Sequence, residues 1–247
     1  MSIEPSIFKM QARSDIAQLA EQFANNRHVR IHGFLEEPLA AALHRHLEGR
    51  TDWQQVLNSG SSLFELDRPT RAALSPAKRA ALDEAVWQGA SIGFQHRYET
   101  LRLPDGDQPT ASVLGPLDGL THWLSSGKMR TLLRRITGME DIDFADGQAT
   151  AYGPGDFLTG HDDAVAGKRR LAAYVLGLTP IWRLEWGGLL LFHRARGAVS
   201  GTIPGFNTLD LFAVPQMHSV SAVVPAATQR RYAITGWLRS SPSDQSV

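Results

Sequence analysis

The segment YGPGDFLTGHDDAVAGKRR, residues 152–170, concentrates side chains that can bind a metal ion. It places His161 and Asp163 two positions apart, between a glycine-rich turn and an apolar stretch typical of a strand. Alternate residues of a strand point to the same side, so the pattern predicts that these two side chains converge while Asp162 points away. An H-x-D triplet also arises by chance, and polar residues at a turn and a strand end are the alternative explanation.

A converging pair needs a third ligand from a distant strand. His218 is the best candidate, because it begins an apolar strand in VPQMHSVSAVV. Two histidines and one carboxylate form the facial triad of non-haem Fe(II) oxygenases, which leaves coordination positions open for reactants. Other histidines fit this chemistry less well: His122 and His193 are typical surface or hydrogen-bonded residues, and the HRH at 44–46 falls on a predicted helix, where such neighbours do not share a face.

A second candidate site residue lies in QRRYAITGWL near the end of the chain. In the predicted last strand, Arg231 shares a face with Ala233 and Thr235, whereas Arg230 fits a solvent-facing edge. Burial of an arginine is costly unless its charge meets an anion, and its planar fork suits a carboxylate. Arg231 is therefore a candidate for binding a carboxylate ligand.

The chain that must position these residues has 247 residues, of which 43% are hydrophobic, and carries 25 basic and 25 acidic residues. It can bury a substantial core, and its zero net charge gives no general attraction to nucleic acid or membranes. The absence of cysteine excludes disulfides and thiolate ligands, which leaves His, Asp and Glu as the strong metal ligands. Without a long apolar run or a signal-peptide pattern, we expect a cytoplasmic protein.

The sequence divides into two parts with different secondary-structure patterns. Residues 10–140 show mainly helical patterns: DIAQLAEQFANN, PLAAALHRHLEG, SPAKRAALDEAVWQGA and LDGLTHWLSSGKMRTLLRRITG, with HVRIHGF as a strand. Ser75 is an expected N-cap, Gly138 an expected helix end, and 103–112 an expected exposed loop. After about 140, short apolar runs between turns predict an antiparallel barrel or sandwich: GQATAYG, LAAYVLGLT, GGLLLFH, NTLDLFAV, HSVSAVV and RYAITGWL.

Five motifs in this second part together resemble a known family: YGPGDFLTGHDD, RRLAAYVLGLT, WRLEWGGLLLF, MHSVSAVV and RYAITGW. They are similar to the 2-oxoglutarate and Fe(II)-dependent dioxygenases of the prolyl-hydroxylase type, and most similar to the ribosomal-protein prolyl hydroxylases. The resemblance is detailed over residues 145–240 and general before them. It implies one dioxygenase domain over 1–247, in which a helix-rich part, about 1–140, supports a double-stranded β-helix (jelly-roll) core, about 141–240.

The resemblance also implies a site. His161, Asp163 and His218 would hold Fe(II), Arg231 would grip the distal carboxylate of 2-oxoglutarate, and Tyr152 would line the cosubstrate pocket. Two positions depart from the family pattern: Ala233 replaces a frequent serine, and Gly177 replaces a frequent tyrosine. Tyr174 or Tyr152 is the expected replacement for the lost hydroxyl groups.

The implied activity is hydroxylation of an unactivated C–H bond in a prolyl residue of a protein or peptide. It would use Fe(II), 2-oxoglutarate and O2, with ascorbate as a reductant, and release succinate and CO2. The 103–112 loop and the helical part would wall the substrate site. The alternatives are hydroxylation of another peptide side chain or of a small molecule, a metal-dependent isomerase or metal-binding β-barrel without redox chemistry, and a binding module that has kept the fold without catalysis.

Overall fold

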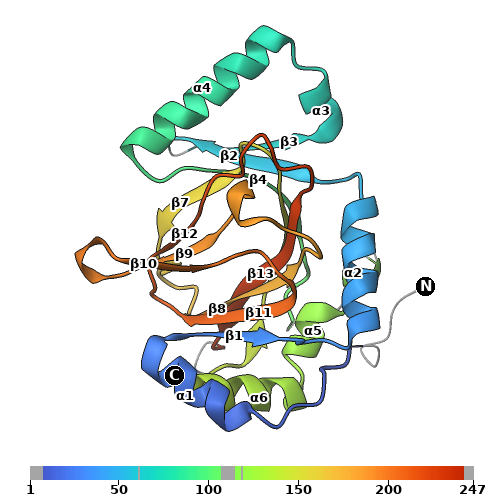
Figure 1. Cartoon of the computed structure of the whole chain (residues 1–247), viewed down its shortest axis with the longest axis vertical. Helices are drawn as coiled ribbons and strands as arrows, with labels where there is room; N and C mark the ends of the chain where they lie inside the picture. The colour runs from blue at the N-terminus through green and yellow to red at the C-terminus, as the bar shows by residue number, and fades with distance from the viewer. Residues whose placement is uncertain (1–7, 61, 107–114, 118, 242–247) are drawn as a thin grey trace, which may run out of the picture.

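The computed structural model describes residues 8–60, 62–106, 115–117 and 119–241. Helices α1 and α6 pack together beneath β1, α2 runs along one side, and α4 lies across the opposite end over β2 (Figure 1). The α-helices are α1 (Ile16–Asn26), α2 (Glu37–Gly49), α3 (Arg68–Ala72), α4 (Pro76–Ile92), α5 (Leu120–Leu124) and α6 (Gly127–Thr137).

The strands form one continuous antiparallel network, in the order β1-β11-β8-β13-β6-β4-β7-β12-β9-β10, with β2 joining β4 and β3, and β5 joining β13. They are β1 (His28–His32), β2 (Gln54–Ser59), β3 (Ser62–Asp67), β4 (His96–Arg102), β5 (Phe144–Ala145), β6 (Gln148–Tyr152), β7 (Phe157–His161), β8 (Arg170–Leu178), β9 (Leu190–His193), β10 (Val199–Thr202), β11 (Phe206–Ala213), β12 (His218–Val220) and β13 (Arg231–Arg239).

Side chains along the central strands alternate between the inner and the outer face of the curled sheet. On β8, Ala173 and Val175 pack against Phe192 and Phe212 between the two halves of the curled sheet. The alternate residues Tyr174 and Leu176 belong to the large core cluster, in which the outer face of the sheet meets the helices. This arrangement is a double-stranded β-helix supported by helices, and it confirms the predicted fold class.

Local signals set the helix ends as predicted. The Ser75 hydroxyl accepts a hydrogen bond from the Lys78 amide at 3.3 Å, and Pro76 occupies the first turn of α4. At the end of α6, Gly138 adopts the left-handed conformation, with φ of 69°. The helix predictions for α1, α2, α4, α5 and α6 are confirmed.

The secondary structure of the first 140 residues differs from the mainly helical prediction. They contain β2, β3 and β4, which sequence reasoning missed. Residues 103–106 of the predicted exposed loop lie outside helices and strands, but the predicted exposure is wrong: Leu103 and Gly106 are buried, and the Gly106 amide donates to the Ala145 carbonyl oxygen. Residues 107–112 lie outside the described part of the chain.

Candidate metal centre and its pocket

Three side chains, from two neighbouring strands and the turn that follows one of them, meet at one end of the barrel. His161 ends β7 and His218 begins β12, and the two residues are paired in the ladder. Asp163 Oδ1 lies 3.5 Å from His161 Nε2, and its Oδ2 lies 3.4 Å from His218 Nε2. Ligand atoms placed at right angles about 2.1 Å from one ion would be about 3 Å apart, so the three groups are arranged to share a metal. They are a cluster of potential ligands whose ligand atoms all lie within 4.8 Å of one another.

Hydrogen bonds fix which nitrogen each histidine presents. His161 Nδ1 lies 3.0 Å from the Thr159 carbonyl oxygen, and His218 Nδ1 lies 2.7 Å from that of Gln216. A carbonyl only accepts, so both Nδ1 atoms must carry the proton and donate. Both Nε2 atoms are then left with a lone pair directed toward Asp163. Outer hydrogen bonds of this kind are what orient metal-binding histidines.

The charges of the three groups also suit a cation. Burial, together with the nearby His161, lowers the pKa of His218 to about 4, which keeps this imidazole neutral and able to act as a ligand. Burial raises the pKa of Asp163, but contacts with His161 and His218 outweigh it and hold the pKa below its usual value. The site therefore presents a neutral His218 imidazole and the Asp163 carboxylate at neutral pH.

The convergence has a different local cause from the one that the sequence suggested. His161 is the last residue of β7, and Asp163 lies beyond the strand with φ of 65°. A left-handed residue turns the chain back, so the carboxylate reaches its position through a turn and not through strand alternation. Arg170 holds this turn by donating to the Asp163 carbonyl oxygen at 3.0 Å.

The three groups open into a cavity of about 380 Å³. Sequence reasoning missed several of its walls, above all β4, which contributes His96 and Tyr98. Trp237 also lines it, with its ring 3.4 Å from the Arg170 guanidinium carbon. Two buried nitrogens of lining residues have no hydrogen-bond partner within the described chain: His96 Nδ1 and Arg170 Nε. Such orphaned polar groups are what a bound polar ligand would satisfy.

Arg231 reaches the same cavity from the first position of β13 and is 4% exposed. Its guanidinium carbon lies 5.0 Å from the ring centre of Tyr152, which stacks on Tyr98. Within the described residues, no carboxylate lies within ion-pair distance of Arg231. Burial lowers the pKa of this guanidinium, yet it stays charged at any ordinary pH, so the pocket holds a desolvated cation that lacks an anion.

The other predicted pocket residues have different surroundings. The Tyr174 hydroxyl donates to the Asp146 carbonyl oxygen at 2.9 Å, and its ring belongs to the core beneath the helices, although the residue also borders the cavity. This placement does not suit the expected cosubstrate contact, because strand alternation turns the side chain outward. We expected Arg230 to be a solvent-facing edge residue. Instead, it lies 3.0 Å from the buried carboxylate of Glu99.

Comparison with known proteins agrees with this geometry. Residues 147–239 match the family model of the 2OG-Fe(II) oxygenase superfamily. A prolyl-4-hydroxylase from Pseudomonas putida superposes with a TM-score of 0.59 at 18% identity, covering 92% of this chain and 99% of that protein. A 2OG-Fe(II) oxygenase family oxidoreductase from Burkholderia pseudomallei gives 0.59 at 15% identity, covering 93% and 92%.

A third structure is the prolyl hydroxylase of Trichoplax adhaerens in complex with a peptide fragment of the hypoxia inducible factor oxygen degradation domain. It superposes with a TM-score of 0.57 at 18% identity and covers 91% of this chain and 89% of that one. No curated protein matches the chain by sequence. At these identities the superpositions establish the shared fold.

A double-stranded β-helix with a two-histidine, one-carboxylate cluster in its mouth defines a class of metal-dependent oxygenase. It agrees with the match of residues 147–239 to the 2OG-Fe(II) oxygenase superfamily, whose enzymes are dioxygenases that use Fe(II), 2-oxoglutarate and O2. No helix within the described ranges has both the length and the apolar character needed to cross a membrane.

Proposed function

We propose that this oxygenase hydroxylates a prolyl residue of a protein or peptide, with His161, Asp163 and His218 as its iron ligands. One observation carries the proposal: this cluster opens into the same cavity as Arg231, which has no carboxylate within ion-pair distance among the described residues. The donor set suits Fe(II), since two imidazoles and one carboxylate occupy one side of the ion and leave the other open. The buried guanidinium fits the far carboxylate of 2-oxoglutarate.

Each residue has a distinct part in this proposal. Bound iron with 2-oxoglutarate and O2 supplies an oxidant that can hydroxylate an unactivated C–H bond, with succinate and CO2 as the co-products. Arg231 pairs with the distal carboxylate and so fixes the orientation of the cosubstrate. Tyr152 covers the guanidinium with its ring, and the nearby Tyr98 hydroxyl, 3.4 Å from Gln148 Nε2, is a further polar group in the pocket.

The apolar part of the cavity excludes water from the reacting groups. Val175, Leu190, Phe212 and Val220 line it beside the metal cluster. Because this apolar lining excludes water, it strengthens the charge pairing at Arg231 and protects the oxidant from side reactions.

The size and the rim of the cavity support a peptide substrate. Its 380 Å³ is near the lower end of the range of about 300–1,000 Å³ typical of ligand pockets, and 2-oxoglutarate would fill part of it. The remaining space suits one side chain of a larger molecule better than a whole metabolite. At the rim, Phe94 and Val165 are 52% and 48% exposed, which offers apolar contact to residues on either side of a proline.

A peptide assay tests this function. The protein is loaded with Fe(II), supplied with 2-oxoglutarate in air, and incubated with two peptide libraries that differ only in having proline or alanine at one position. We expect added oxygen only in proline-containing peptides, detected by mass spectrometry, and equal formation of succinate. The control is His218→Ala, which should give neither product. Oxygen added to alanine-containing peptides or to small molecules alone would contradict the prolyl assignment.

A further inference from the structure

A second cavity of about 400 Å³ lies on the other side of strand β4. Strand β4 sends His96 and Tyr98 into the metal pocket, whereas Arg97 and Glu99 line this second cavity. The remaining walls come from β2, α3, α4 and the segments next to Tyr152 and Arg231. We call this cavity the arginine pocket, because its charged lining residues are Arg68, Arg71, Arg79, Arg97 and Arg230, with Asp83, Glu99 and Asp156.

The internal ion pairs of the arginine pocket do not balance its charge. Glu99 is fully buried and is shared by Arg68, Arg71 and Arg230. Arg97 takes up both of the other carboxylates, through an ion pair with Asp83 and a 3.4 Å approach to Asp156. Five guanidinium groups against three carboxylates leave two positive charges in excess among the lining residues.

The excess charge lies on guanidinium groups with unused donors. The side chain of Arg79 is exposed and makes no hydrogen bond or ion pair with any residue in the described ranges. Arg230 Nη1 is buried and has no aligned hydrogen bond, although it lies 3.0 Å from Glu99 Oε2. Arg71 uses Nη1 on Glu99, and its other nitrogens have no partner within the described chain.

By contrast, Arg68 and Arg97 are fully engaged. Arg68 makes two hydrogen bonds to Glu99 and one to the Arg50 carbonyl oxygen, and Arg97 contacts two carboxylates and the Gly155 carbonyl oxygen. These contacts hold the pocket in shape before any ligand arrives. The free donors of Arg71, Arg79 and Arg230 therefore border a prearranged cavity.

We propose that the arginine pocket is a binding site for a phosphoryl group, carried by inorganic phosphate or by a small phosphomonoester. A phosphoryl group carries nearly two negative charges and has three strong acceptor oxygens. These match the two excess positive charges and the unused guanidinium donors of the pocket. Arginine is the side chain best suited to bind phosphate through paired donors. This inference concerns a different cavity from the metal centre and does not rest on the proposed function.

Titration of the metal-free, full-length protein tests the site. Inorganic phosphate is added at constant ionic strength in chloride buffer, and binding is measured by calorimetry. We expect saturable binding of one phosphate per chain. Glycerol 3-phosphate forms the second arm: tighter binding than inorganic phosphate identifies an ester as the physiological source, and weaker binding identifies free phosphate. Absence of saturable binding in both arms would overturn the proposal.

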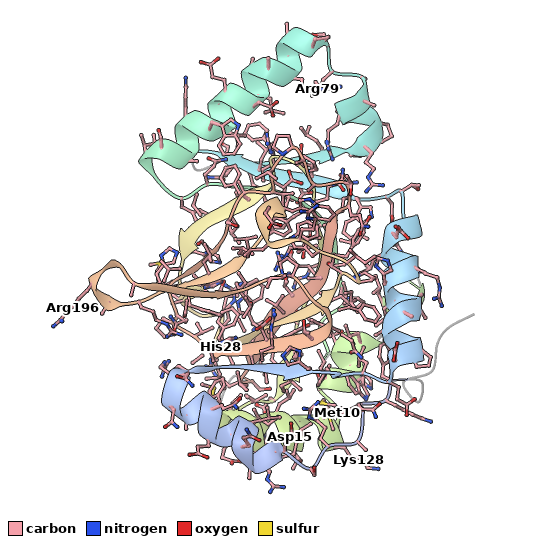
Figure 2. All side chains as sticks on the ribbon, in the orientation of Figure 1. Met10, Asp15, His28, Arg79, Lys128 and Arg196 are labelled. Atoms are coloured by element: carbon pink, nitrogen blue, oxygen red, sulfur yellow. The ribbon has the colours of Figure 1, made fainter. Side chains whose placement is uncertain are left out.

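Two charge reversals on exposed arginines show whether binding is local. Arg79→Glu removes a free donor from the pocket, whereas Arg196→Glu makes the same charge change at the tip of the β9–β10 hairpin, far from Arg79 (Figure 2). We expect Arg79→Glu to weaken phosphate binding about tenfold or more and Arg196→Glu to leave it unchanged, because only a nearby charge pairs strongly in salt. Equal weakening by both variants would show a general charge effect and overturn the site.

A second variant, Arg71→Gln, tests the site independently of Arg79→Glu. Arg71→Gln removes the charge but keeps a polar side chain, and it leaves Glu99 with two arginine partners. At the same phosphate concentration, the melting temperature should rise more for the wild type and Arg196→Glu than for Arg79→Glu or Arg71→Gln. The same thermal shift in all four proteins would contradict the assignment.

Discussion

At the scale of single residues, Arg231 and Arg230 are adjacent but serve different cavities. Arg231 has no anionic partner within the described chain, whereas Arg230 contacts Glu99. We expect Arg231→Ala to weaken 2-oxoglutarate binding about thirtyfold or more, since a desolvated charge pair is worth roughly 2–5 kcal/mol, and to leave Fe(II) affinity nearly unchanged. Arg231→Lys should rescue binding only in part, because it keeps the charge but loses the fork.

The measurement is the dissociation constant of 2-oxoglutarate with Fe(II) under nitrogen. Arg230→Ala is the matched control and should change it little. A larger effect at position 230 than at 231 would mean that the inward face of β13 has been assigned to the wrong residues.

The two neighbouring aspartates also differ in their expected effects. Asp163→Ala should weaken Fe(II) binding by more than about a hundredfold, because even the loss of an outer hydrogen bond to a metal ligand can cost about 10–100-fold. Asp162→Ala should keep most of the affinity, since its carboxylate accepts a hydrogen bond from the Ala164 amide at 3.0 Å and is outside the cluster. Anaerobic titration with Fe(II) gives both values, and equal losses would refute the choice of carboxylate.

At the scale of elements, the close contact of β8 with β11 explains the glycine at position 177. A Cβ atom there would lie 2.6 Å from the Gly205 carbonyl oxygen and 2.8 Å from Thr208 Oγ1. The space that a side chain would need is therefore already filled. Gly177→Ala should lower the free energy of unfolding by about 1–3 kcal/mol, as overpacking does.

Denaturant unfolding measures this effect. The matched control is Gly49→Ala at the end of α2, where an added Cβ meets nothing within 4 Å and should not destabilise the protein. Equal stability of Gly177→Ala and the wild type would show that the two strands are not packed this closely.

The turn between β6 and β7 carries a buried carboxylate that should make stability depend on pH. Burial raises the pKa of Asp156 from 3.8 to about 6, despite its hydrogen bond from the Gly153 amide. The folded state then binds more protons than the unfolded state between about pH 4 and 6, so this group's contribution to stability falls as the pH rises through that window.

Asp156→Asn removes this dependence. Relative to the wild type, the variant should therefore be more stable at pH 7 than at pH 4.5, by about 1–3 kcal/mol. Urea unfolding at the two pH values gives the comparison, and a difference that is independent of pH would contradict the raised pKa.

At the scale of the whole molecule, the sequence predicted the parts whose patterns are local. The apolar face of α6 and its terminal glycine, and the alternation along β13, are visible in the residues themselves, and the structure has them as expected. The metal cluster also followed from residue types, because the absence of cysteine left few possible ligands.

What the sequence did not reveal has a physical reason. Strand β4 has polar residues on both faces, since one face meets the metal pocket and the other the arginine pocket, so it shows no hydrophobic alternation. The turn at Asp163 depends on a left-handed backbone that an aspartate gives no clear sign of adopting. The surroundings of Tyr174 depend on which face of β8 meets the helices, and that is a property of the assembled sheet.

The central claim is that one cavity holds iron through the cluster and 2-oxoglutarate through Arg231. The most direct test is anaerobic titration of the Fe(II)-loaded protein with 2-oxoglutarate while the visible absorption spectrum is recorded. The account predicts a weak charge-transfer band of a keto acid chelate that saturates at one cosubstrate per chain, that needs a higher concentration in Arg231→Ala, and that does not form in Asp163→Ala. Absence of the band when iron and 2-oxoglutarate are both bound to the wild type would contradict the claim.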